Sequence, residues 1–343
     1  MTRKRLSIIA ATAVTTSLIA GSALGSAVAS AASLTGAGST LVAPLEGAWA
    51  IDFERRYGES VTYAAVGSGA GIAQITARTV DFGASDAPLT PSQAAACNRC
   101  IQIPWALGAV GISYNIPGVR NLRLTGPVIA NIYLGKITNW NDPAIAKLNP
   151  GASLPATKIR PVYRSDSSGD TYAFSDFLAK VSPEWKSKAG VSTQVSFPVG
   201  IGGKGNDGVA AAIGGTDGAL GYLAISYVFA NKLDYALVEN AAGNFPVPGS
   251  DSIGAAAAAV STIPRDNAIS LTNPPPSAPK AYPISTFTYA LVPQRSSKAK
   301  TLRDFLTYAL GPGQKFGAKL QFEPLPARVV DAGRTTIARI GSS

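Results

Sequence analysis

The stretch GAVGISYNI at residues 108–116 has the apolar, β-branched composition of a buried strand, and ISTFTYALV at residues 284–292 has it again. Between them lies a central segment long enough to form a domain of its own. The chain would then leave one domain, build a second and return. We therefore expect a discontinuous first lobe, residues 30–115 and 284–343, and a second lobe, residues 116–283. Two strands would join the lobes, and a ligand would bind between them.

The segments around these stretches alternate between strand-like and helical patterns. SVTYAAV (60–66) and VDFGASD (80–86) have strand composition, and IAQITARTV (72–80) between them has helical spacing. The strongest break is NPPPSAPKAYP (273–283), directly before the second strand stretch. This alternation predicts an α/β fold with mixed sheets.

The first 29 residues have the pattern of a secretory signal peptide. Basic residues 3–5 precede an apolar run at about 6–24, and the small residues 27–29 end it. An uncleaved transmembrane anchor is the alternative, but threonines, a serine and a glycine interrupt the run, which is short for a span. We expect an exported protein, periplasmic or extracellular at the cell envelope.

Composition narrows the function. The net charge is +10, and the basic residues are scattered rather than clustered, which argues against nucleic-acid binding. The chain contains no histidine. Every catalytic scheme that needs a histidine is therefore excluded, and only carboxylate or lysine chemistry remains for an enzyme.

The two cysteines, Cys97 and Cys100, are three residues apart. In an exported protein such a pair most simply forms a small disulfide. A zinc site would need two more nitrogen or sulfur ligands, and a redox pair would be expected to open a helix after a strand. We expect a disulfide and no metal.

Three segments share one design, in which a strand-like run is followed by a turn of glycine and hydroxyl residues and then by a helix. They are LTGAGSTLVAPLEGAWA (34–50), YAAVGSGAGIAQITA (63–77) and PVYRSDSSGDTYAFSDFLAK (161–180). A hydroxyl residue stands at each expected N-cap, and helix starts attract anions through free N–H groups. Each turn alone is an ordinary capped helix, but three together predict a common anionic ligand.

Charged residues accompany these turns. Arg164 offers a planar fork suited to an oxyanion, although a surface salt bridge with Asp166 is the alternative. Asp86 follows a strand-like run, and Asp170 stands at a helix start, where it could also be a capping residue. A calcium loop from Asp166 fails, because its sixth and twelfth positions are threonine and phenylalanine.

A carboxylate in an anion site has a selective effect. Because it only accepts hydrogen bonds, it repels a fully ionised oxyanion and favours one that keeps an O–H. Phosphate keeps a proton at neutral pH and sulfate does not. An aspartate among helix-start donors therefore indicates selection for protonated phosphate over sulfate or molybdate.

Six motifs together resemble the high-affinity phosphate-binding protein of bacterial ABC phosphate importers. In order along the chain they are LTGAGSTLVAP, VGSGAGIAQI, VDFGASDAPL, YLGKITNWNDPAIAKLNPG, YRSDSSGDTYAF and GGKGNDGVAAAIGGTDGALGY. The resemblance implies a two-lobed periplasmic-binding-protein fold, the type II Venus flytrap, with two hinge strands. It also implies a monomer that delivers inorganic phosphate to membrane permease subunits, without a cofactor or catalysis.

The resemblance also implies which residues contact phosphate. These are Thr40, the Leu41 amide, Ser68, Asp86, Arg164, Ser168, the Gly169 amide and Asp170, with Asp166 supporting Arg164. Some members have phenylalanine at position 41 and threonine at position 170. Asp170 therefore adds a second carboxylate acceptor, and our hypothesis is that it favours the phosphate monoanion, which carries two O–H groups.

Other functions remain open on the sequence alone. An exported phosphatase that uses aspartate or serine is one, although no histidine or lysine stands beside the candidate serines. A phosphate-binding surface protein or sensor without a permease is another, and the motifs do not separate it from an importer component.

Overall fold

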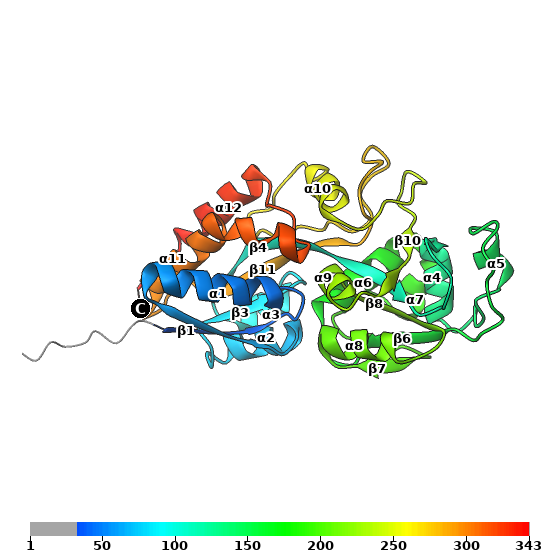
Figure 1. Ribbon diagram of the computed structural model, residues 1–343. Helices are drawn as coiled ribbons and strands as arrows, with labels where there is room; N and C mark the ends of the chain where they lie inside the picture. Colours follow the sequence, from blue (N-terminus) through cyan, green and yellow to red (C-terminus); the bar gives the residue numbers. More distant parts are fainter. Residues whose placement is uncertain (1–32, 343) are drawn as a thin grey trace, which may run out of the picture. The chain divides into compact units, whose positions relative to one another are not determined.

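The computed structural model describes residues 33–342, which are organised around a nine-stranded mixed sheet (Figure 1). Eight strands pair in the order β2 (Ser60–Ala65), β1 (Ser33–Gly38), β3 (Phe82–Ser85), β11 (Ser285–Pro293), β4 (Cys100–Tyr114), β8 (Ala219–Ala224), β6 (Arg160–Arg164) and β7 (Ile201–Gly203). The ninth, β9 (Asp234–Tyr235), pairs with β4, and β5 (Arg123–Leu124) and β10 (Leu237–Val238) form a small separate sheet.

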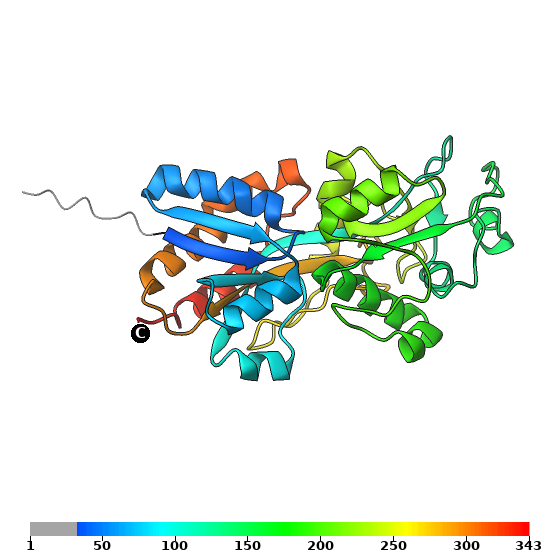
Figure 2. The same ribbon diagram turned by 90° about the horizontal axis from the view of Figure 1, so that it is seen from below.

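Strand β4 belongs to both halves of this sheet. Up to Ala109 it pairs antiparallel with β11, and from Val110 it pairs antiparallel with β8. All of its residues after Cys100 are buried, in keeping with the apolar composition that predicted a strand. Figure 2 shows β4 passing from one group of strands to the other. We call the halves the first lobe (β1, β2, β3, β11) and the second lobe (β6, β7, β8).

The helices of the first lobe surround an aromatic core. They are α1 (Ala43–Tyr57), α2 (Ser68–Thr76), α3 (Pro91–Ala96), α11 (Ala299–Ala309) and α12 (Ala327–Ile337), with 3₁₀ turns at Pro312–Phe316 and Ala318–Leu320. Trp105 packs edge-on against Trp49, Phe82 and Phe305, with ring centres 5.2–6.2 Å apart. Such edge-to-face pairs add to the stability that burial of the rings provides.

The second lobe has its own aromatic core. Its helices are α4 (Gly126–Tyr133), α5 (Pro143–Ala146), α6 (Gly169–Val181), α7 (Pro183–Lys188), α8 (Gly205–Gly214) and α9 (Ile225–Ala230), and α10 (Ser250–Ala258) lies on β4 and β11. The rings of Phe174 and Tyr222 stack at 4.2 Å, and Tyr133 packs edge-on against Phe174. Each lobe therefore has a core that positions its own helix starts.

Four helices begin where parallel strands end. In the first lobe α1 follows β1 and α2 follows β2, and in the second lobe α6 follows β6 and α8 follows β7. The carboxyl ends of parallel strands meet at one edge of a sheet, and ligands of open α/β sheets bind there. This arrangement places the three predicted anion-binding turns at such edges.

The predicted strand at 108–116 is longer than expected, since β4 begins at Cys100. Pro104 has no N–H for a sheet ladder, so its presence in a central strand is unusual. The register shifts opposite Thr288, so that Trp105 is an extra residue in β4. This bulge accommodates the proline within a central strand.

The predicted helix at 72–80 begins earlier, at Ser68, and ends at Thr76, because Arg78 adopts a left-handed φ of 58°. The predicted disulfide between Cys97 and Cys100 is confirmed, and it joins the end of α3 to the start of β4.

The expected signal peptide, and the alternative of an uncleaved anchor, lie outside the residues that the structure describes. Within residues 33–342, no helix has the length and apolar character needed to span a bilayer.

Candidate functional site

The predicted site residues of both lobes lie in one buried cluster. The predicted contact residues are all buried, and the side chain of Asp166, predicted to support Arg164, is 13% exposed. Thr40 and Leu41 precede α1, Ser68 begins α2, Asp86 follows β3, Arg164 ends β6, and Ser168, Gly169 and Asp170 begin or directly precede α6. With Ser39, Asp166, Asn206 and Thr288, which contact them, these residues are called the interlobe cluster below.

Only one of the three predicted hydroxyl N-caps is correct. Ser168 caps α6, since its Oγ accepts from the backbone N–H groups of Asp170 at 3.0 Å and Thr171 at 3.4 Å. The N-cap of α1 is Val42, and that of α2 is Gly67, without side-chain bonds. Gly67 has a φ of 95°, which a side chain would strain, so glycine is favoured at this turn.

Asp86 is the buried acceptor of the first lobe. Its Oδ1 and Oδ2 lie 2.6 and 2.7 Å from Ser39 Oγ, and Oδ1 also accepts from Thr288 Oγ1 at 2.8 Å. Ser68 Oγ donates to Oδ2 at 3.3 Å. Burial, and then the charge of Asp170, raise the pKa of Asp86 to about 7, although the Ser39 and Thr288 bonds oppose the shift. Asp86 can therefore hold a proton near neutral pH.

Arg164 is the buried cation of the second lobe. Its Nε donates to Asp166 Oδ1 at 2.7 Å, and its Nη2 and Nη1 donate to the carboxylates of Asp166 and Asp170. Burial opposes its charge, but the bonds with Asp166 and the charge of Asp170 raise the pKa of Arg164 above its usual value. A second hydrogen remains on each of Nη1 and Nη2 for another acceptor.

Asp166 lies against Arg164 and accepts hydrogen bonds from it. Its Oδ1 also accepts from the Gly205 backbone N–H at 2.9 Å. Burial alone would raise the pKa of Asp166, but the bond and charge of Arg164 outweigh burial and lower it. Asp166 therefore carries a charge that orients and partly neutralises the guanidinium.

In Asp170, one carboxylate oxygen accepts hydrogen bonds and the other has no hydrogen-bond partner within the described residues. Oδ2 accepts from Arg164 Nη1, from Asn206 Nδ2 at 2.9 Å and from Ser168 Oγ at 3.4 Å. Oδ1 is buried and has no hydrogen-bond partner within the described residues. Burial raises the pKa of Asp170 while Arg164 opposes the shift. A buried oxygen without a hydrogen-bond partner is costly, so Oδ1 favours the binding of a ligand group that can donate a hydrogen bond to it.

The two halves of the interlobe cluster contact each other directly. The Gly169 N–H donates to Ser68 Oγ at 3.0 Å, and the Gly69 N–H donates to the Ser167 carbonyl at 3.0 Å. A Cβ on Gly169 would lie 2.5 Å from Asp86 Cβ, and one on Gly69 would lie 2.1 Å from Ser167 Oγ. The lobes are therefore in a closed arrangement that depends on glycine at both positions.

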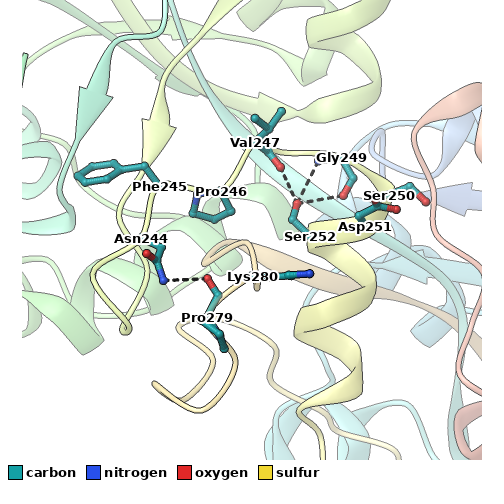
Figure 3. A pocket seen from close by; sticks show the side chains of 10 residues that line it. All are labelled: Asn244, Phe245, Pro246, Val247, Gly249, Ser250, Asp251, Ser252, Pro279 and Lys280. Carbon is teal, nitrogen blue, oxygen red and sulfur yellow. Dashed lines mark hydrogen bonds between the residues drawn. The ribbon is translucent and has the colours of Figure 1, made fainter.

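A separate pocket of about 630 Å³ lies at the start of α10 (Figure 3). Ser252 Oγ donates to the Val247 carbonyl at 2.7 Å and accepts from the Gly249 N–H at 3.3 Å, while Asn244 Nδ2 donates to the Pro279 carbonyl at 3.2 Å. These polar groups therefore already have hydrogen-bond partners among the residues that line the pocket. None of its lining residues belongs to the interlobe cluster.

Comparison with known proteins gives the family. The family model for the PBP superfamily domain matches residues 24–312. The phosphate-binding protein PstS of Xylella fastidiosa strain Temecula1 is 41% identical over 303 residues, which cover 87% of this chain and 82% of that protein. The chain belongs to the PstS family of phosphate-binding proteins. PstS 3 of Mycobacterium leprae is 36% identical over 307 residues, covering 85% and 83% of the two chains.

A solved structure agrees with the PstS fold. A high-affinity periplasmic phosphate-binding protein, determined with phosphate at pH 8.5, superposes with a TM-score of 0.72 at 23% identity, covering 88% of this chain and 93% of that one. The predicted two-lobed periplasmic-binding-protein fold is confirmed, and so is the resemblance on which it was based.

Sequence reasoning missed three cluster residues of this PstS family member. Ser39 and Thr288 both donate to Asp86, and Asn206 contacts Thr40 and Asp170. Ser39 stands next to a predicted residue and could have been included. Thr288 lies inside a strand, 202 residues from its partner, so no local pattern identifies it.

Proposed function

We propose that this protein binds inorganic phosphate between its two lobes and delivers it to the permease of an ABC importer. The observation that carries the proposal is the convergence of Asp86, Asp170 and Arg164 in one buried cluster built by both lobes of a PstS family member. One guanidinium among three carboxylates, with Asp166 as the third, favours a ligand that brings both an anionic oxygen and hydrogens of its own.

Each residue has a distinct role in the proposal. Thr40, Ser68 and Ser168 offer hydroxyl groups, and Arg164 offers the remaining hydrogens on Nη1 and Nη2 to phosphate oxygens. Asp86 and Asp170 accept hydrogen bonds from the O–H groups of phosphate.

Backbone donors complete the proposed site. The N–H of Leu41 donates to Ser39 Oγ at 3.0 Å and that of Gly169 to Ser68 Oγ. A phosphate oxygen would replace these hydroxyls as the acceptor. Both amides stand at helix starts, which favour a negative ligand.

Delivery follows from closure. Groups from both lobes are satisfied together only when the lobes meet, so a bound ligand shifts the population toward the closed form that a permease would recognise. We propose a discontinuous first lobe, residues 30–115 and 284–343, and a second lobe, residues 116–283. We also propose an exported monomer without enzymatic activity, at the periplasmic or outer face of the cell envelope.

Titration calorimetry of the dialysed protein tests the proposal. Phosphate should bind with one site per chain at pH 7, and an equal concentration of sulfate should not compete. Arg164→Ala should abolish phosphate binding, whereas Arg120→Ala, which removes an exposed surface pair with Asp234, should not change it. Sulfate binding equal to that of phosphate would contradict the proposal.

A chromogenic phosphate ester separates this proposal from a phosphatase. The protein should release no product from the ester while phosphate binding is intact. Release that disappears in Asp86→Asn would instead favour catalysis at this cluster.

A further inference from the structure

Asn206 is one of the residues at which the two halves of the interlobe cluster meet. It is the second residue of α8, and its side chain is fully buried. Its Oδ1 accepts from the Ala224 backbone N–H at 2.7 Å. Its Nδ2 donates to Thr40 Oγ1 at 2.8 Å and to Asp170 Oδ2 at 2.9 Å. One acceptor and two donors are therefore all in use.

The contact with Thr40 fixes the direction of the threonine hydroxyl. Because Asn206 donates to Thr40 Oγ1, that oxygen is an acceptor in this bond, and its own hydrogen is directed elsewhere. Within residues 33–342, Thr40 Oγ1 has no second hydrogen-bond partner. Asn206 thus leaves Thr40 as a donor toward the ligand.

The contact with Asp170 fixes which carboxylate oxygen remains free. Rotation of a carboxylate about its last torsion is broad and nearly two-fold, and besides Arg164 and Asn206 the only donor to Oδ2 within residues 33–342 is Ser168 Oγ, at 3.4 Å, so Asn206 adds a shorter bond that fixes the choice of oxygen. Asn206 and Arg164 both donate to Oδ2, and Oδ1 remains unpartnered and buried. Asn206 therefore presents Oδ1 of Asp170 as an acceptor.

One side chain thus prepares a donor on Thr40 from the first lobe and an acceptor on Asp170 from the second lobe. Thr40 precedes α1 of the first lobe and Asn206 lies in α8 of the second, so their bond forms only when the lobes are together. The Tyr227 hydroxyl supports the same contact by donating to the Thr40 carbonyl at 3.0 Å.

We propose that Asn206 is a positioning residue that links lobe closure to ligand selection, by directing the Thr40 hydroxyl and the free Asp170 oxygen at a protonated oxyanion. This inference rests on the proposed function and extends it to a residue outside the predicted contacts. Asn206 does not bind phosphate itself. It acts through Thr40 and Asp170.

A double-mutant cycle tests the proposal, with inorganic phosphate as the probe and calorimetry at pH 7 as the measurement. Asn206→Ala should weaken binding roughly 10- to 100-fold, and Thr40→Val should weaken it by a similar factor. The double variant should lose much less than the product of the two factors, because each change removes the same bond. Independent losses that multiply would overturn the inference.

Asn206→Asp is the second variant, because it keeps an oxygen that can accept from Ala224. Its other oxygen faces Asp170 Oδ2, so it repels that carboxylate when ionised and can donate only when protonated. Phosphate affinity should therefore fall more at pH 8 than at pH 6, relative to the wild type. An equal loss at both pH values would indicate a merely structural role and contradict the proposal.

Asn149 provides the matched control. It is a buried asparagine of the second lobe whose amide bonds the Arg123 backbone and the Ile145 carbonyl, away from the cluster. Asn149→Ala should lower thermal stability and leave phosphate affinity within about twofold. A wild type that binds no phosphate would overturn the proposed function itself, whereas a wild type that binds and an Asn206→Ala that binds equally well would overturn only this inference.

Discussion

At the scale of single residues, the interlobe cluster holds more acid than base. Three carboxyl groups, those of Asp86, Asp166 and Asp170, accompany the one guanidinium of Arg164, which pairs with Asp166 and Asp170. The bond and charge of Arg164 lower the pKa of Asp166, whereas burial raises the pKa values of Asp86 and Asp170. Asp86 and Asp170, whose pKa values are raised, are the carboxyl groups that would face the ligand. They favour a ligand with O–H groups that can donate hydrogen bonds.

The first prediction concerns Asp170. Wild-type affinity for phosphate should increase as the pH falls from about 8 to about 6, because more of the phosphate is then the monoanion, whose two O–H groups can donate to the two carboxylate acceptors. Asp170→Thr replaces the second acceptor with a hydroxyl and should flatten this dependence. Calorimetric titrations at several pH values measure it, and equally flat profiles in both proteins would reject the idea.

The second prediction concerns stability rather than binding. Glu46 on α1 is 2% exposed, and its Oε1 has no partner within the described residues. Burial raises the pKa of Glu46 to about 8, so the folded chain keeps a proton that the unfolded chain loses near pH 4.5. Stability therefore falls as the pH rises from 4.5 to 8.

Glu46→Gln should remove this loss. The variant should gain stability over the wild type as the pH rises, up to about 5 kcal/mol at pH 8 as an upper limit. Urea unfolding at pH 5 and pH 8 measures the difference. A gain of the same size at both pH values would show that ionisation of Glu46 is not the cause.

Sequence reasoning reached part of this residue-level arrangement. Arg164 and Asp170 could be predicted because they stand at a turn whose glycine and hydroxyl residues mark a helix start, and Asp86 because it directly follows a strand-like run. Asn206 and the direction of its two N–H groups could not, since they depend on Thr40 and Asp170, which are 166 and 36 residues away. Hydrogen-bond direction across two lobes is set by tertiary structure alone.

At the scale of elements, the start of α2 determines how closely the lobes approach. Gly69 is the second residue of α2 and contacts Ser167, which precedes α6 in the other lobe. A helix tolerates alanine better than glycine, so the glycine is not explained by helix formation. The close approach of Ser167 explains why this position has no side chain.

The third prediction uses this contact. Gly69→Ala should leave α2 intact or slightly more stable, because alanine is the better helix former. The added methyl would overpack the interlobe contact at a cost of about 1–3 kcal/mol, so phosphate affinity should fall roughly 5- to 150-fold. Gly47→Ala in α1 is the control, since a Cβ there meets no atom within 4 Å.

Affinity by calorimetry and closure by X-ray scattering, with and without phosphate, measure the effect. Equal affinity in Gly69→Ala and Gly47→Ala would contradict the role of Gly69.

The sequence patterns predicted that these helices and strands exist more accurately than they predicted where each one begins and ends. The bulge at Trp105 hid the first part of β4, and the caps of α1 and α2 are backbone features rather than serine or threonine side chains. The hydroxyl of Ser68 is consequently available for Asp86 and Gly169. A local pattern identifies a helix start but not whether its hydroxyl caps the helix or faces another lobe.

At the scale of the whole molecule, a chain that leaves and re-enters one lobe builds a site from segments far apart in sequence. The apolar stretches at 108–116 and 284–292 predicted strands, and the structure pairs β4 with β11 on one side and with β8 on the other. The contacts between the lobes could not be predicted, because they are made by turns and the first residues of helices rather than by periodic faces.

The ratio of phosphate to sulfate affinity tests the central claim most directly. Both are tetrahedral oxyanions, but only phosphate brings a hydrogen at neutral pH. Calorimetry at pH 7 should show phosphate binding at least about a hundredfold tighter than sulfate, since a buried acceptor without a donor is costly. Asp86→Asn, which offers an amide in place of the carboxylate, should reduce this preference at least about tenfold. Equal binding of the two anions by the wild type, or an unchanged ratio in Asp86→Asn, would contradict the account.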